Sequence, residues 1–379
     1  MIIKNGFVYN TDRICFEQKD IIIKNGLIAG YGEDNSDTFV IDADGALLIP
    51  GLIDVHTHGR VGFDFISASD EELHIMARSY ASVGVLSVMP AIASAPFSDM
   101  LEAVRRINSF VPNKDEADFV GVHIEGRYLN PKKKGAHAED LLMPLSSSEL
   151  DAKEFSDCKA LHITAALELD DGSFASKAKR IGATLGLGHT NATYAEAIEA
   201  EKNGISSYTH LFNCMPSLHH REGGAVCAAL LGDAYAELIC DGIHISPEMI
   251  KLAAVCKGYD RITLVSDSME ATGSSDGEYT IAGNKVIVKD GIARTESGAL
   301  AGSTLSLFDG VKNFASFCGT SIANALLAAT ANPANQVGVY DKLGSLDIGK
   351  SADILIISAD EQPVIKDIII RGELLSKGV

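Results

Sequence analysis

The middle of the chain alternates short apolar runs with amphipathic stretches, and this pattern limits the choice of fold more than any other feature. Buried parallel strands read as short apolar runs, whereas apolar residues every three or four positions indicate helices. The eight predicted strands cover residues 52–55, 85–89, 119–124, 161–167, 183–187, 207–209, 236–239 and 262–265. The clearest predicted helices cover residues 71–82, 99–107, 194–203 and 247–257. Eight strands separated by helices within about 290 residues predict an α/β fold, a (β/α)8 TIM-like barrel, with a doubly wound sheet as the alternative.

Both ends of the chain are rich in β signals. Asn5-Gly6 and Asn25-Gly26 each stand between apolar runs, a pattern typical of hairpin turns. Residues 353–357 and 364–372 read as strands near the other end. Neither end is long enough to bury a sheet alone, so we predict one small β-sandwich domain built from residues 1–50 and 345–379, with the barrel formed by residues 51–344. Residues 276–297 alternate like a hairpin inserted after the last barrel strand.

Composition limits the partners and the compartment. The 379 residues carry 32 basic and 51 acidic side chains, a net charge of −19, which opposes binding to nucleic acid. No apolar run reaches the length of a membrane span, and the first residues lack the pattern of a secretory signal. The seven cysteines are scattered and never spaced C-x-x-C, which argues against a disulfide framework or a zinc finger. We therefore expect a cytoplasmic protein that binds neither nucleic acid nor membrane.

Histidines and carboxylates follow the predicted strands, at the end where barrel enzymes carry their active sites. The residues in these positions are His56, His58, Glu125, His189, His210 and Asp267. Strand carboxyl ends converge on one face of a barrel, so these side chains are expected to meet there. Imidazole nitrogens together with a carboxylate oxygen suit Zn²⁺, Fe²⁺ or a similar divalent ion.

A single histidine in an apolar strand is more often a hydrogen-bonded core residue than a ligand. His56 and His58 are different, because alternate residues of a strand point to the same face. His74 is predicted to lie on a helix surface, and His162 stands at a strand start, the wrong end for chemistry. His123 precedes Glu125 by two residues on the same strand face, where packing or support of the site is the expected role.

The segments around these residues resemble a known family. Pro50-Gly51-Leu52-Ile53-Asp54-Val55-His56-Thr57-His58-Gly59 resembles the opening motif of the amidohydrolase superfamily. An ordered set of later segments is similar to the N-acetylglucosamine-6-phosphate deacetylase family: His123-Ile124-Glu125-Gly126, Lys134-Gly135-Ala136-His137, Gly188-His189-Thr190, Thr209-His210-Leu211-Phe212-Asn213-Cys214-Met215, His220-Arg221-Glu222, Asp241-Gly242-Ile243-His244, Asp267-Ser268-Met269 and Leu300-Ala301-Gly302-Ser303. The resemblance spans nearly the whole chain, including both β-rich ends.

The resemblance implies a role for each matching position. Glu125, His189 and His210 would bind the main metal ion, and His56 with His58 would complete a second site bridged by Glu125, giving one or two divalent ions per subunit, Zn²⁺ first. Asp267 matches the catalytic acid and base. The positions that match sugar-phosphate contacts are Ala136, His137, Asn213, Cys214, Arg221, His244, Leu300, Ala301 and Gly302. The family implies a homodimer in which Arg221 reaches the phosphate in the neighbouring subunit's site.

The implied activity is hydrolysis of the acetamide of N-acetylglucosamine 6-phosphate, in which Asp267 accepts the proton of the attacking water and returns it to the departing amine. Three departures stand out: Arg127-Tyr128 after Glu-Gly, Cys214 where a smaller residue is commoner, and residues 165–168. The extra cation, Arg127, would contact the phosphate or form an outward salt bridge. These departures leave the sugar epimer, glucosamine or galactosamine, open.

Two rival interpretations belong to other classes of protein. A cyclic-imide hydrolase would bridge its metals with a carboxylated lysine at the end of strand four, but residues 161–168 contain no lysine. A non-catalytic relative serving in assembly or binding would be expected to have lost a ligand or the aspartate, and every one of these residues is present here.

Overall fold

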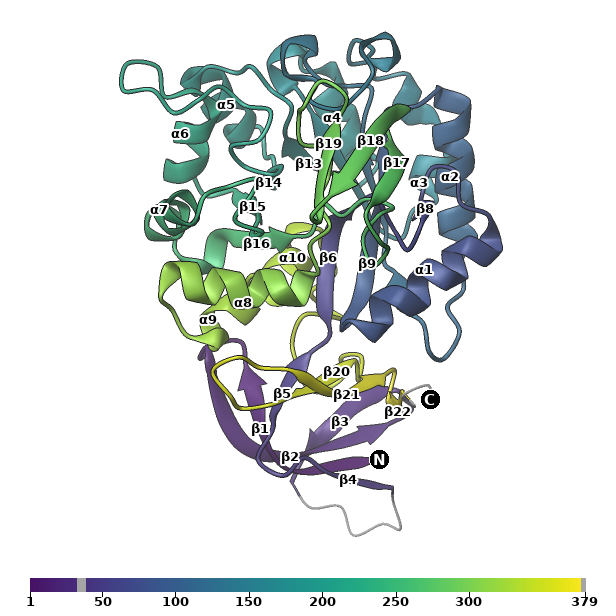
Figure 1. Ribbon diagram of the computed structural model, residues 1–379, viewed down its shortest axis with the longest axis vertical. Helices are drawn as coiled ribbons and strands as arrows, with labels where there is room; N and C mark the ends of the chain where they lie inside the picture. Colours follow the sequence, from purple (N-terminus) through teal and green to yellow (C-terminus); the bar gives the residue numbers. More distant parts are fainter. Residues whose placement is uncertain (33–38, 376–379) are drawn as a thin grey trace.

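The computed structural model describes residues 1–32 and 39–375 and contains a nearly closed barrel of parallel strands (Figure 1). The barrel strands are β6 (Leu52–Thr57), β9 (Val85–Ala93), β10 (Asp118–Phe119), β11 (Val122–Glu125), β12 (Leu161–Ala165), β13 (Thr184–Leu187), β14 (Ser207–Tyr208), β15 (Tyr235–Ile239) and β16 (Ile262–Val265). Their hydrogen-bonded order is β10-β9-β11-β12-β13-β14-β15-β16, with β6 beside β9. A strand lies in each of the eight predicted regions, although several differ from the prediction in extent, and the parallel order confirms the barrel.

The seam between the first and last barrel strands is closed by residues that follow them. Asp267 N donates to His56 O at 2.9 Å, and His58 N donates to Ser268 O at 2.8 Å. These bonds join the chain after β16 to the end of β6. The closure therefore lies at the rim where the predicted site residues stand.

The third predicted strand is divided into β10 and β11 rather than running unbroken from residue 119 to residue 124. The break falls at Val120-Gly121, where the chain packs closely against the next strand. A Cβ on Gly121 would lie 2.5 Å from Ala160 O, so only glycine fits. The fourth strand ends at Ala165, two residues before the predicted end.

Helices surround the barrel (Figure 1). They are α1 (Asp70–Ser82), α2 (Phe97–Ser109), α3 (Lys153–Ser156), α4 (Ser173–Arg180), α5 (Tyr194–Lys202), α6 (Gly224–Leu231), α7 (Pro247–Lys257), α8 (Leu307–Cys318), α9 (Ile322–Leu327) and α10 (Ala331–Gln336). Ser69 before α1 and Thr193 before α5 each form a capping box with the glutamate three residues later, which satisfies backbone donors at the helix start. Among the described residues, none of the helices combines the length and the apolar character needed to cross a bilayer.

Strands from both ends of the chain form one eight-stranded sheet below the barrel in Figure 1. They are β1 (Ile2–Asn10), β2 (Cys15–Lys24), β3 (Leu27–Tyr31), β4 (Val40–Asp42), β5 (Leu47–Pro50), β20 (Ile354–Ile357), β21 (Ile365–Ile370) and β22 (Glu373–Leu374). Alternate residues of β20 point to opposite faces of this sheet. Ile354 and Ile356 pack with other residues of the β unit on one face, whereas Leu355 joins the barrel core on the other. Both ends thus build one β unit, as predicted; residues 33–38 and 376–379 of the predicted domain lie outside the described residues.

The two Asn-Gly pairs of the first strands have different roles. Asn25-Gly26 forms the predicted turn between β2 and β3. Asn5-Gly6 instead lies inside β1, where the pairing with β2 shifts register, so the predicted hairpin turn there is wrong. The pair forms a bulge: Asn5 has φ 56°, and a Cβ on Gly6 would lie 2.8 Å from Leu48 Cδ1.

The insertion after β16 is a small antiparallel sheet that stands over the rim of the barrel. It consists of three strands, β17 (Gly277–Ile281), β18 (Asn284–Lys289) and β19 (Ile292–Thr295), rather than the two of a simple hairpin. Asn284 Nδ2 donates to Ala136 O at 2.7 Å, which ties this sheet to the loop after β11. A further short hairpin, β7 (Gly59–Arg60) with β8 (Phe63–Asp64), follows β6.

Candidate active site

All five predicted metal ligands come together at the carboxyl ends of the barrel strands. His56 and His58 come from the end of β6, Glu125 is the last residue of β11, and His189 and His210 follow β13 and β14 by two residues each. Two groups of three share Glu125: one with His56 and His58, the other with His189 and His210, and the ligand atoms of each group lie within 4.8 Å of one another. The alternation argument for His56 and His58 is thus confirmed in space.

The carboxylate of Glu125 lies between the imidazoles. Its Oε1 is 2.9 Å from His210 Nε2 and 3.3 Å from His189 Nε2, and its Oε2 is 3.0 Å from His58 Nε2. The two nitrogens His189 Nε2 and His210 Nε2 are themselves 3.0 Å apart. Imidazole nitrogens that converge this closely on one carboxylate are typical ligands of a shared cation.

The outer ring nitrogens support this interpretation, because they are held by other groups. His189 Nδ1 lies 2.8 Å from Lys133 O and therefore donates to it, so its Nε2 carries a lone pair. His56 Nδ1 faces Glu237 Oε2 at 3.3 Å, and within the described residues the buried His56 Nε2 has no hydrogen-bond partner. The lone pair on this nitrogen faces two carboxylates rather than a hydrogen-bond donor. A divalent ion bound between them would satisfy it.

The electrostatics of the cluster favour positive charge between the carboxylates. Burial alone would lower the pKa of His56 and His58, but Glu125 and Asp267 raise it, to about 9 for His58. Burial would raise the pKa of Glu125, yet the surrounding imidazoles hold it well below its ordinary value. A cation that binds here replaces protons on the imidazoles. The donor set therefore fits one or two divalent ions.

Asp267 stands beside the pair from β6. Its Oδ1 lies 3.3 Å from His58 Nε2 and 3.5 Å from His56 Nε2. Burial would raise the pKa of Asp267, but these imidazoles outweigh burial and hold the pKa at about 2. The carboxylate is therefore ionised at neutral pH, and it can accept a proton from a water molecule next to it.

Several site residues adopt left-handed backbone conformations that side chains rarely favour. The φ angles are 45° at His189, 31° at His210, 52° at Cys214 and 48° at Asp267. Such conformations cost about 1–3 kcal/mol each and persist where the surrounding structure enforces them. Here the sharp turns directly after β13, β14 and β16 aim the side chains inward over the rim.

A cavity of about 210 Å³ opens over the cluster. Its lining includes His58, Glu125, Ala136, His137, His189, His210, Asn213, Cys214, His244, Asp267, Leu300 and Gly302. Burial lowers the pKa of His137 to about 4, so its ring is neutral, and Ser94 Oγ lies 2.8 Å from its Nδ1. Asp241 Oδ2 accepts from His244 Nδ1 at 2.7 Å and, against the effect of burial, raises the pKa of His244. The cavity thus offers a ligand the neutral imidazole of His137 and the imidazole of His244, whose pKa Asp241 raises.

A sequence model of the amidohydrolase family matches residues 47–375. The chain belongs to the amidohydrolase family. An N-acetylglucosamine-6-phosphate deacetylase of Vibrio furnissii is 37% identical over 83% of this chain and 79% of its own length. An N-acetylgalactosamine-6-phosphate deacetylase of Escherichia coli O157:H7 is 34% identical over 97% of both chains. The crystal structure of an N-acetylglucosamine-6-phosphate deacetylase of Thermotoga maritima superposes with a TM-score of 0.88 at 32% identity, covering 100% of each chain. The resemblance inferred from the sequence is confirmed.

Two residues expected to contact substrate lie outside this amidohydrolase cavity. Ala301 is buried against Met269 and Ile281 under the inserted sheet, while its neighbours Leu300 and Gly302 line the cavity. Its side chain packs in this core, and its contact with substrate stays a prediction. Arg221 is exposed, and its Nη1 donates to His220 Nε2 at 2.6 Å. Its contact with a neighbouring subunit stays a prediction.

Arg127 forms the outward salt bridge, one of its two expected roles. Its Nη2 pairs with Glu149 Oε1 at 2.9 Å, and its guanidinium stacks over Phe97, 5.0 Å from the ring centroid. The supporting role expected of His123 is also confirmed: the ring is buried, with Nε2 2.8 Å from Thr164 Oγ1 and Nδ1 3.2 Å from Val55 O.

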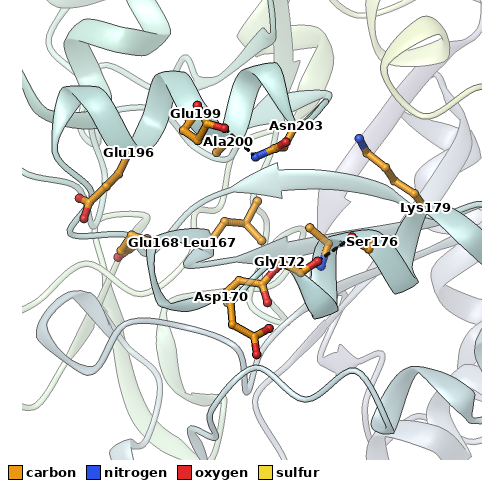
Figure 2. A pocket seen from close by; sticks show the side chains of 12 residues that line it. Leu167, Glu168, Asp170, Gly172, Ser176, Lys179, Glu196, Glu199, Ala200 and Asn203 are labelled. Carbon is orange, nitrogen blue, oxygen red and sulfur yellow. Dashed lines mark hydrogen bonds between the residues drawn. The ribbon is translucent and has the colours of Figure 1, made fainter.

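Sequence reasoning missed the carboxylate of Glu168, which joins three loops of the rim. Glu168 Oε1 accepts from Asn130 Nδ2 at 2.9 Å and from Asn191 N at 2.7 Å, and its Oε2 accepts from Thr190 Oγ1 at 2.6 Å. Asn130 N in turn donates to His189 O at 3.0 Å. Glu168 therefore fixes the loop that carries His189. It also borders a separate cleft of about 400 Å³ lined by η4 (Leu167–Leu169), α4 and α5 (Figure 2).

We expect Glu168→Gln to lower the stability of the protein by about 1–3 kcal/mol, seen as a lower Tm in thermal unfolding. Three donors converge on this carboxylate, and an amide would present its own donor to one of them. Glu199→Gln, across the same cleft in Figure 2, is the matched control, because Glu199 is exposed and its side chain contacts Lys202 and Asn203 at the end of its own helix rather than another loop of the rim. Equal Tm values for the two variants would contradict the role of Glu168.

Proposed function

We propose that this chain catalyses the metal-dependent hydrolysis of the acetamide of N-acetylglucosamine 6-phosphate, giving glucosamine 6-phosphate and acetate. The observation that carries the proposal is the pair of histidine groups sharing Glu125, with the ionised Asp267 3.3 Å from His58, at the base of a cavity. Relatives that are 37% and 34% identical and named as deacetylases of amino-sugar phosphates support the substrate class.

Glu125, His189 and His210 hold the main ion, and His56 and His58 hold a second with Glu125 between them. Zn²⁺ is the first choice, because the ligands are imidazoles and one carboxylate. A divalent ion bound there polarises the carbonyl oxygen of the acetamide and lowers the pKa of water to about 7. The chain's own residues then move the protons and hold the sugar.

Asp267 accepts the proton of the attacking water and delivers it to the nitrogen as the carbon–nitrogen bond breaks. Without this transfer the amine would leave as an anion, and hydroxide would be expelled instead. The neutral ring of His137 accepts from Ser94 N at its Nδ1, so its Nε2, 3.7 Å from Glu125 Oε2, carries the proton and can donate to the acetyl oxygen or a sugar hydroxyl. The ring of His244, whose Nδ1 is held by Asp241 Oδ2, presents its Nε2 to the phosphate as a hydrogen-bond donor. Ala136, Asn213, Cys214, Leu300 and Gly302 form the remaining walls.

The proposal extends to assembly and location. The protein forms a homodimer in which Arg221 reaches the phosphate in the neighbouring subunit's site, and it works in the cytoplasm. Residues 51–344 are the catalytic unit, and residues 1–50 with 345–379 form the β domain.

Hydrolysis of N-acetylgalactosamine 6-phosphate is the second candidate, favoured by the relative that matches 97% of the chain. The test of both is acetate release from a panel of N-acetylated sugars, each epimer with and without the 6-phosphate, with elemental analysis of the same sample. The proposal expects the highest kcat/KM for the phosphorylated glucosamine derivative and bound divalent metal. Release from neither phosphorylated epimer would overturn it.

We expect Arg221→Ala to raise KM for the phosphorylated sugar by about tenfold or more while leaving the slow turnover of the unphosphorylated sugar nearly unchanged. A guanidinium gives a phosphate two parallel charge-assisted hydrogen bonds, whereas a hydroxyl in its place offers little to bind. Steady-state kinetics on both sugars measure the split. Arg261→Ala is the control, because Arg261 is a half-buried arginine that contacts Asp260 and the ring of Tyr235 and does not line the cavity. Equal changes on both sugars would count against a phosphate contact.

A further inference from the structure

We infer that Glu237 is a positioning residue that orients His56 and thereby builds the second metal subsite; this inference rests on the proposed function. Glu237 lies on β15, and its side chain is completely buried in the barrel interior below the cavity. A lone carboxylate between Ala236 and Leu238 in an apolar strand is costly to bury unless it is paired. Its partners therefore show what it does.

Four donors converge on this carboxylate. Oε2 faces His56 Nδ1 at 3.3 Å and accepts from His210 N at 3.3 Å. Oε1 accepts from Gln336 Nε2 at 2.6 Å and from Ser207 Oγ at 3.2 Å. Glu237 thus contacts the ring of His56 in one histidine group and the backbone N–H of His210 in the other.

The contact with His56 determines which ring nitrogen faces the site. Only a protonated Nδ1 makes a favourable bond to a carboxylate, so the neutral ring leaves the lone pair on Nε2. That nitrogen is the buried atom without a hydrogen-bond partner in the described residues, and it points at Glu125 Oε1 (3.4 Å) and Asp267 Oδ1 (3.5 Å). A carboxylate behind a ligating imidazole also makes the ring more basic toward a cation.

Glu237 acts on the two subsites unequally. For His56 it contacts the ring itself, whereas for His210 it contacts only the backbone N–H, and the ring of His210 reaches Glu125 independently at 2.9 Å. Loss of the charge on Glu237 should therefore weaken the ion held by His56 and His58 more than the ion held by His189 and His210.

The decisive variant is Glu237→Gln. Gln336 Oε1 is buried without a partner in the described part of the chain, so the Gln336 amide can turn over and accept from the new amide. The variant then keeps the shape and hydrogen bonds of the barrel interior but loses the charge. Zn²⁺ stoichiometry after dialysis and Zn²⁺ affinity by competition with a chromophoric chelator are measured on the full-length protein, together with Tm.

The inference expects two ions per chain in the unaltered protein and an affinity for the second ion that is about 10- to 100-fold weaker in Glu237→Gln. Glu116→Gln is the matched control. Glu116 is equally buried, but it lies outside the site and pairs with His74 and Arg78. This variant should have a lower Tm but should still bind the second ion.

Four results would overturn the inference, and they are distinguishable. Two ions of unchanged affinity in Glu237→Gln would reduce Glu237 to packing while leaving the proposed function intact. An equal loss of the second ion in Glu116→Gln would assign the effect to general destabilisation. Should Glu237→Gln fail to fold, the same comparison is made with the exchange variant Glu237→Gln/Gln336→Glu. This variant keeps one carboxylate and one amide in the network but moves the charge away from His56, and retention of full affinity there would refute the role. A single ion in the unaltered protein would remove the two-ion site itself.

Discussion

Asp267→Asn is expected to lower kcat by about 10²- to 10⁴-fold, the usual contribution of a general acid–base, while the protein keeps its bound metal. The amide can neither accept the proton of the attacking water nor return it to the amine. The asparagine side chain has nearly the same shape beside His56 and His58. The two histidine groups that share Glu125 are unchanged. Acetate release and elemental analysis on the same preparation separate the two effects.

The control for this variant is Asp353→Asn, a half-buried aspartate of the β unit that accepts from Ser351 Oγ and Arg371 N. It carries the same chemical change far from the barrel rim and should leave kcat near that of the unaltered protein. Turnover by Asp267→Asn at the unaltered rate would remove Asp267 from the mechanism. Loss of metal in that variant would instead make Asp267 a ligand.

Glu125→Gln should have an effect of similar size for a different reason, since it removes the carboxylate common to both histidine groups. We expect loss of bound metal and a fall in kcat/KM of about 10³-fold, the equivalent of the several kcal/mol that a Lewis acid supplies. Excess Zn²⁺ in the assay should not restore the rate, because the imidazoles alone lack the negative charge that offsets the ion's charge.

Glu149→Gln provides the comparison for Glu125→Gln. Glu149 pairs with Arg127 and Tyr128 in the loops near β11 but does not line the cavity over the histidines. Its replacement should leave metal content and kcat unchanged. Full metal content in Glu125→Gln would show that the imidazoles suffice and would contradict the bridging role.

The ends of the barrel strands could be predicted from the sequence because local chemistry determines them. A strand buried on both faces is mostly apolar, so a carboxylate at its end is visible in the sequence, as with Glu125 at the end of β11. The spacing of His56 and His58 placed both on one face without any knowledge of their partners. The ligands could therefore be identified one strand at a time.

Other features depended on neighbours that are distant in sequence. Asn5-Gly6 and Asn25-Gly26 are the same dipeptide between apolar runs, yet one is a bulge and the other a turn. The difference comes from what each packs against, Leu48 in the first case and the backbone of Arg371 in the second. Glu237 carried a visible signal, a charge in an apolar strand, but its meaning came from His56 and Gln336, which lie 181 and 99 residues away.

The sequence by itself determined the barrel, the β-rich ends, and which four histidines and which glutamate and aspartate stand at the strand ends, since each follows from the polarity pattern of a few consecutive residues. Only the tertiary structure decided that Glu125 lies between both histidine groups, that Ala301 faces the core and that Arg127 faces Glu149. It also placed Glu168 against the loop that carries His189, and Glu237 against the ring of His56. Those facts are distances between segments far apart along the chain, and such distances are set by how the strands and loops pack rather than by any local pattern.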